Sequence, residues 1–150
     1  LIQHWPAFTF AAIVPVAAIA CGGDSDRLSR AEFLARGNAL CAESNARMDS
    51  AAEEAFGGVE GQPEREALST FFGVLTDEVR GQIDGVDALV PPKEMEDQVE
   101  ELIATANVEY DRMVAQIEAD PVAFAQDEAD PFAEANAMNA AMGLSECAGS

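Results

Sequence analysis

Apolar and small residues recur at every third or fourth position along three long stretches of this sequence. The first two stretches are 29–56 and 63–90, and the third begins at 92 or 93 and runs to about 119. This spacing places the apolar residues on one face of a helix, and no stretch has the sustained alternation of a β-strand. The pattern therefore predicts an all-α protein.

Residues that favour helix ends mark where the helices begin and stop. Ser29 and Glu32 have the spacing of a capping box, in which each side chain accepts a hydrogen bond from the other residue's backbone N–H. Asp120-Pro121 and Asp130-Pro131 each place an N-cap residue before a proline in the first turn. They predict a short helix and then a last helix, which ends at Gly143 in a left-handed cap.

Four amphipathic helices joined by short links predict a four-helix bundle with up-down-up-down topology. A chain of 150 residues has room for one domain. We place that domain at residues 29–150, with the apolar faces of the helices turned toward a common core.

The N-terminal part of the chain has the pattern of an export signal. Residues 7–20 carry no charge, and this run is long enough for a signal peptide but short for a membrane span of ~20 residues. The stretch Ala18-Ile19-Ala20-Cys21 resembles a bacterial lipobox, in which a peptidase cuts before a cysteine that then carries a diacylglycerol. This resemblance implies a lipoprotein signal peptide at 1–20, lipidation of Cys21 and a flexible tether at 21–28. A plain secretory signal and a transmembrane anchor are the alternatives.

The two cysteines that remain, Cys41 and Cys147, are predicted to form a disulfide. Export would place them in an oxidising compartment, and lipidation of Cys21 would leave an even number. In the expected bundle, Cys41 lies ~22 Å from the end of its helix, and the last helix returns ~18 Å from that same end, so the two sulfurs reach similar heights. The alternative is a pair of buried thiols that pack as small hydrophobes.

Several short segments resemble those of small Ala-rich actinobacterial exported lipoproteins. They are EFLARGNALCAESNARM in the first helical stretch, the central LVPP turn before a charged helix, and the closing MGLSEC. The resemblance implies a helical domain held by a disulfide. Because that group has no assigned activity, the resemblance carries over no catalytic residue.

The charge of the chain restricts its partners. There are 28 acidic and 8 basic residues, with a formal net charge of −20, and Lys93 is the only lysine. Such a surface repels nucleic acid and acidic substrates but attracts cations or a basic protein partner. The acidic run at 94–101 could bind Ca²⁺ weakly through carboxylates, although a solvated helix face explains it as well. A shortage of lysine beside many acids also resembles proteins from salt-rich habitats.

The sequence offers little for catalysis or for cofactors. His4, the only histidine, lies in the expected signal peptide, so the mature chain has no imidazole for a catalytic triad, a di-iron site or a His-rich zinc site. There is no phosphate-binding loop. We therefore predict no catalytic residue, no metal site and no cofactor.

Together these features predict a non-enzymatic binding or structural lipoprotein on the extracytoplasmic face of the cell membrane, with an unknown partner. The alternative is an extracytoplasmic carrier that holds an apolar ligand or haem inside the bundle. Tyr110, on the apolar face of the third helix, could then ligate haem iron, although such a tyrosine more often packs its ring in a core. A carrier should contain a core cavity of ~300 Å³ or more.

Overall fold

The structure of the chain is a computed structural model that describes residues 26–58 and 64–149. These residues form five α-helices and two 3₁₀ helices and contain no strand, which confirms the all-α prediction. The signal peptide expected at 1–20 and the expected lipidation site Cys21 lie outside the described residues. In chain order the elements are α1 (Arg30–Phe56), α2 (Arg65–Asp87), η1 (Lys93–Met95), α3 (Glu96–Ala119), α4 (Pro121–Gln126), α5 (Ala133–Met142) and η2 (Ser145–Cys147).

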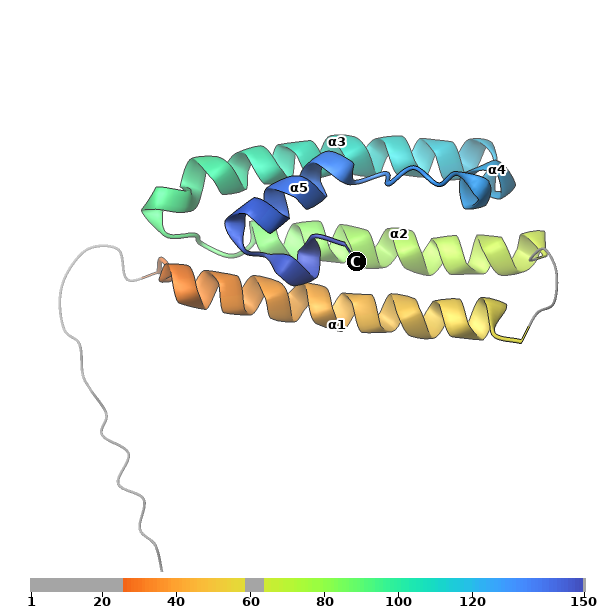
Figure 1. Cartoon of the computed structure of the whole chain (residues 1–150), viewed down its shortest axis with the longest axis horizontal. Coiled ribbons are helices and arrows are strands. Elements are labelled where there is room, and N and C mark those ends of the chain that lie inside the picture. The colour runs from red at the N-terminus through yellow and green to blue at the C-terminus, as the bar shows by residue number, and fades with distance from the viewer. Residues whose placement is uncertain (1–25, 59–63, 150) are drawn as a thin grey trace, which may run out of the picture.

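Three long helices, α1, α2 and α3, lie side by side along the long axis of the molecule (Figure 1). α2 packs against both α1 and α3, and the short α4 packs against α2 and α3. α5 packs against α3, and η2, which follows α5, packs against α1. α5 has only 10 residues, whereas the shortest of the long helices has 23, so α5 covers part of their length.

Several helix ends agree with the caps expected from the sequence. Ser29 and Glu32 form both hydrogen bonds of a capping box at the start of α1. The Asp120 side chain accepts hydrogen bonds from the backbone N–H groups of the second and third residues of α4. Gly143 has φ +97° after α5, a conformation that glycine adopts without steric cost. Local sequence signals therefore fixed these three ends.

The start of α5 differs from the prediction. Asp130-Pro131 was expected to open this helix, but its first residue is Ala133, because residues 131–132 form a turn. The Asp130 carboxylate accepts a hydrogen bond from the Phe132 N–H at 2.8 Å instead of capping the helix. The cap comes from α3, where Glu109 accepts hydrogen bonds from two N–H groups in the first turn of α5. A tertiary contact thus replaced the local cap.

The most deeply buried side chains lie where α1, η1 and the chain after α5 meet. Phe33, Met95 and Leu144 are each 0% exposed. Leu144 packs against Gly37 of α1 so closely that a Cβ atom at position 37 would lie 2.6 Å from Leu144 Cδ2. The missing side chain of Gly37 therefore lets the C-terminal segment lie directly against α1.

The described chain begins against this same end of the molecule. The Leu28 N–H donates to the Val90 carbonyl at 3.0 Å, and Arg27 donates to the Pro91 carbonyl and pairs with Glu96, each at 3.1 Å. These last residues of the expected tether are thus attached to the helical domain. None of the helices in the described ranges has the combination of length and apolar character that crossing a bilayer requires.

Candidate functional site

The disulfide between Cys41 and Cys147 joins α1 to η2, as predicted, with the two Cα atoms 5.1 Å apart. Two asparagines of α1 flank it. Asn38 accepts a hydrogen bond from the Glu146 N–H at 2.9 Å, and Asn45 donates to the Glu146 carbonyl at 2.8 Å. Asn38 and Asn45 are three residues before and four after Cys41, so all three lie on one face of α1. This spacing was a signal in the sequence that our reasoning missed.

A pocket of about 210 Å³ lies between α1, α2, α3, α5 and the C-terminal segment, and we call it the interhelical pocket. Both cysteines of the disulfide line it, and it reaches buried apolar side chains of the core such as Ile83, Leu102 and Ala135. Its volume exceeds the ~150 Å³ of an apolar cavity that binds benzene. It is smaller than the ~300 Å³ at the lower end of pockets for drug-sized ligands.

Asn139 on α5 lines the interhelical pocket and is only 8% exposed. Its Nδ2 donates to the Cys147 carbonyl at 3.0 Å, which fixes the orientation of the amide because the carbonyl needs a donor. Its Oδ1 is buried and accepts no hydrogen bond, and no other side-chain nitrogen or oxygen in the described ranges shares this state. An unpaired buried acceptor is costly, which sets Oδ1 apart from the other buried polar side-chain atoms of the described residues.

The remaining amide side chains of the pocket have partners. Asn45 Oδ1 accepts a hydrogen bond from Gln82 Nε2 at 3.0 Å. Asn136 Nδ2 donates to the Asp130 carboxylate at 2.9 Å. These contacts join lining residues to one another or to a neighbouring turn.

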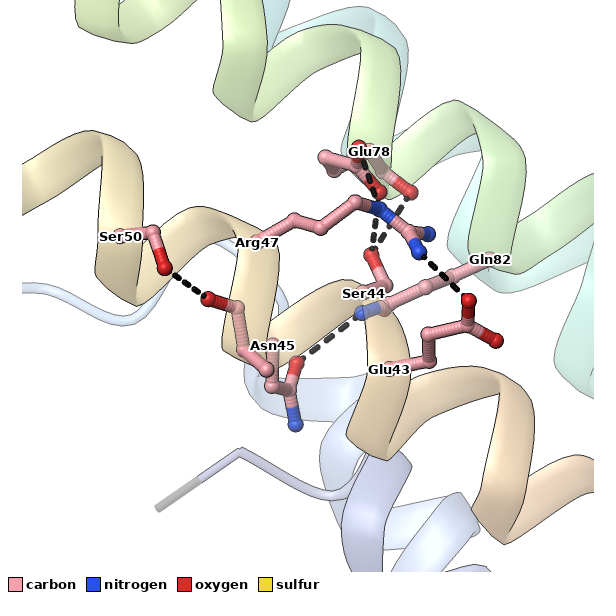
Figure 2. A network of polar contacts seen from close by, with 8 residues as sticks. Glu43, Ser44, Asn45, Arg47, Ser50, Glu78 and Gln82 are labelled. Atoms are coloured by element: carbon pink, nitrogen blue, oxygen red, sulfur yellow. Dashed lines mark hydrogen bonds and ion pairs between the residues drawn. The ribbon is translucent and has the colours of Figure 1, made fainter.

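A polar network beside the pocket ties α1 to α2 (Figure 2). Ser44, only 2% exposed, donates to Glu78 Oε2 at 3.0 Å, and Arg47 Nε donates to Glu78 Oε1 at 2.8 Å. Arg47 also pairs with Glu43 at 3.2 Å. The hydrogen bond from Arg47, with that from Ser44, holds the pKa of Glu78 below its ordinary value, and the bond to Glu78 raises the pKa of Arg47.

Glu109 on α3 positions the helix that carries Asn139. It is 6% exposed, and its two carboxylate oxygens accept hydrogen bonds from the N–H groups of Glu134 and Ala135 at 3.2 and 3.1 Å. A carboxylate at the start of a helix is also favoured by the helix dipole. Glu109 and Asn139 are polar residues at positions where the helical repeat places buried ones, and this mismatch was a second signal in the sequence.

Tyr110, the expected core tyrosine or haem ligand, is half-buried and packs against the core without lining the interhelical pocket. The Arg80 guanidinium carbon lies 3.9 Å from the centre of its ring, a distance typical of a cation–π contact. Arg80 also donates to Asn107 at 2.7 Å. Tyr110 is thus held in a contact between α2 and α3 and is not directed at a ligand space.

A second and larger hollow of about 440 Å³ lies between α2, the end of α3 and Pro121. Of its lining residues only Phe72 is buried, and the others, such as Ser69 and Gly73, are partly or fully exposed. It is large enough by volume, but it is a surface groove that does not enter the core, so it is not the core cavity expected of a carrier.

The acidic side chains between residues 94 and 101 are all exposed, and one of them, Glu96, pairs with Arg27. Within the part of the chain that the structure describes, no three His, Cys, Asp or Glu side chains gather into a set that could hold a metal ion.

Comparison of the chain with protein-family models, with curated proteins and with solved structures gives no match.

Proposed function

We propose that this protein is a non-enzymatic, extracytoplasmic lipoprotein that binds a small apolar ligand in the interhelical pocket. The observation that carries the proposal is a pocket of about 210 Å³ that enters the buried core and is lined mainly by apolar side chains. Ligand pockets in helical bundles are typically built in this way, from side chains on facing helices. The volume suits a molecule of one ring with small substituents and is too small for haem.

The lipobox-like sequence before Cys21 supports attachment to a membrane through lipid. A disulfide in the folded domain fits the same location, because disulfides persist in oxidising compartments. Mass spectrometry of the mature N-terminus tests this part of the proposal. We expect the mature chain to begin at Cys21 and to carry a diacylglycerol on that residue. A mature chain that begins at another residue and carries no lipid would contradict the proposed lipidation.

We further propose that α1, α2, α3 and α5 act as an up-down-up-down four-helix bundle around the pocket. All four helices supply residues to its lining, and α5 packs on α3 while the disulfide returns the chain to α1. A crystal structure of the chain tests this arrangement, and a detached α5 would contradict it.

Thermal unfolding with and without toluene tests ligand binding by the whole chain. A compound that binds only the folded state raises the melting temperature. We expect saturating toluene to raise the melting temperature of the wild type. The rise should be lost in Ala135→Leu, which fills the pocket from α5.

Ala137→Leu is the matched control, because Ala137 lies on the same helix, is exposed and does not line the pocket. It should keep the toluene response. No response in the wild type, or equal responses in both variants, would contradict binding at this site.

A further inference from the structure

The charged groups around the interhelical pocket are acidic, and we propose that its ligand is a small amine with an apolar body and one ammonium group. This inference rests on the proposed function, since it names the class of ligand for the same pocket. The apolar body would lie among the core side chains. The ammonium group would stay at the mouth beside Glu146, the only charged residue that the described chain contributes to the lining.

Glu146 is held at the mouth of the pocket through its backbone. Its N–H donates to Asn38 at 2.9 Å and its carbonyl accepts a hydrogen bond from Asn45 at 2.8 Å, so both groups are bonded to α1. The residue lines the pocket but is exposed, which places it at the opening and not in the core. An ammonium group in the core would lose its hydration, whereas at the opening it can pair with this carboxylate and stay partly hydrated.

The rest of the lining favours a cation over an anion. Its other polar side chains are neutral amides, namely Asn45, Gln82, Asn136 and Asn139, and no basic residue of the described ranges lines the space. The turn before α5 adds a second carboxylate, because Asp130 accepts a hydrogen bond from Asn136 at 2.9 Å. An anion would therefore meet negative charge without a basic partner, in a chain with a formal net charge of −20.

The arginines that adjoin lining residues in the sequence do not reverse this preference. Arg47 pairs with carboxylates of α1 and α2, and Arg80 lies 3.9 Å from a carboxylate of α2 and from one of α3. Arg112 is exposed and directly follows Asp111 on α3. The charge around the pocket therefore remains acidic.

Benzylamine and benzyl alcohol are suitable probes because they have nearly the same shape, and only benzylamine is charged at neutral pH. In calorimetric titrations of the whole chain, we expect both to bind the wild type. Glu146→Gln should weaken benzylamine relative to benzyl alcohol by about two- to fivefold, the effect of one exposed ion pair. Glu101→Gln is the control, because it removes the same charge from an exposed position that does not line the pocket, and it should leave the ratio unchanged.

Measurements on the wild type cover the case in which Glu146→Gln does not fold. The affinity for benzylamine should fall as salt is raised, because ions screen an exposed charge pair, while the affinity for benzyl alcohol should stay nearly constant. The ¹⁵N–¹H NMR signal of Glu146 should shift more with benzylamine than with benzyl alcohol.

The outcomes separate this inference from the proposed function. If both compounds bind with the same salt dependence, or if Glu146→Gln and Glu101→Gln change the ratio equally, the preference for an amine is wrong while the pocket function stands. If neither compound binds, both proposals are wrong.

Discussion

The two halves of the molecule close the same three long helices in different ways. In the half that contains the N-terminus of α1, which we call the disulfide half, α5 and η2 are fastened to the long helices by Cys41–Cys147, by Glu109 and by Asn38 and Asn45. The other half, which we call the aromatic half, contains α4 (Figure 1). It is closed by packing between phenylalanine rings.

The rings of the aromatic half form a chain of contacts across three helices. Phe56 of α1 lies 5.1 Å from Phe71 of α2, Phe71 lies 5.6 Å from Phe72, and Phe72 lies 5.3 Å from Phe124 of α4, measured between ring centres. Such ring pairs give about 0.5–1.5 kcal/mol each beyond the area they bury. Covalent and charged contacts are specific in geometry.

The different ways in which the two halves are closed explain where the interhelical pocket forms. Its lining includes Pro131 and Phe132, just before α5, as well as the disulfide and the C-terminal Gly149. The pocket therefore lies at the edge of the cover that α5 and the C-terminal segment provide. A short helix held by fixed contacts cannot slide to fill this space, whereas a purely apolar interface could repack.

Reduction of the Cys41–Cys147 disulfide, in the disulfide half, should lower the stability of the protein more than any other change. The two cysteines are 106 positions apart, and in the chain-entropy model a cross-link of that span is worth ~4.7 kcal/mol. We expect reductant to lower the melting temperature of the whole chain strongly, as should the Cys41→Ala, Cys147→Ala double variant. Thermal unfolding measures this, and an unchanged melting temperature would refute the structural role of the bridge.

Removal of the Glu109 carboxylate should have the next largest effect. Glu109→Ala leaves two N–H groups of α5 without their acceptor and should cost about 2–3 kcal/mol. Hydrogen exchange should then increase in α5 more than in the aromatic half. The control is Glu101→Ala on the exposed face of the same helix, and a cost as small as that of the control would contradict the capping role.

Two glycine substitutions compare the halves directly. A Cβ at Gly37 would meet Leu144 at 2.6 Å, whereas a Cβ at Gly73 would meet no atom within 4 Å. Gly37→Ala should therefore destabilise the protein by about 1–3 kcal/mol through overpacking. Gly73→Ala should stabilise it by up to about 1 kcal/mol through helix propensity. Chemical denaturation measures both, and effects of the same sign would contradict the close approach.

The smallest expected effect is the pH dependence of the stability that Glu78 contributes. The pKa of Glu78 is lowered in the folded state, chiefly by the hydrogen bond from Arg47, so its ionised form contributes stability above the ordinary value of 4.5. That contribution is lost as the pH falls below 4.5 and through the lowered pKa. Because half of the Arg47 side chain is exposed, we expect less than about 1 kcal/mol.

The difference in unfolding free energy between wild type and Glu78→Gln isolates this effect from other carboxylates. It should be largest near neutral pH and should shrink as the solution is acidified below 4.5. A difference that stays constant or grows on acidification would show that the ion pair does not stabilise the folded state.

Most of the helical elements could be predicted from the sequence, because their signals are local. The repeat of apolar residues gave the three long helices, and Ser29, Asp120 and Gly143 set helix ends within one turn of themselves. The pairing of Cys41 with Cys147 was also predicted. That prediction depended on the expected lipidation of Cys21, which leaves two cysteines, and the helix lengths agreed with it.

The site depended on contacts that no local signal specifies. Glu109 and Asn139 are polar residues in buried stripes, which marks them as unusual, but a stripe does not tell which partner each residue meets. Glu109 accepts a hydrogen bond from Glu134, which lies 25 residues further along the chain. The side-chain nitrogen of Asn139 donates to the Cys147 carbonyl, and its side-chain oxygen has no partner among the described residues. The sequence alone determined which segments are helical, because that follows from neighbours three or four residues apart. The tertiary structure decided where α5 begins and that a pocket forms beside it, because both result from distant segments competing for the same space.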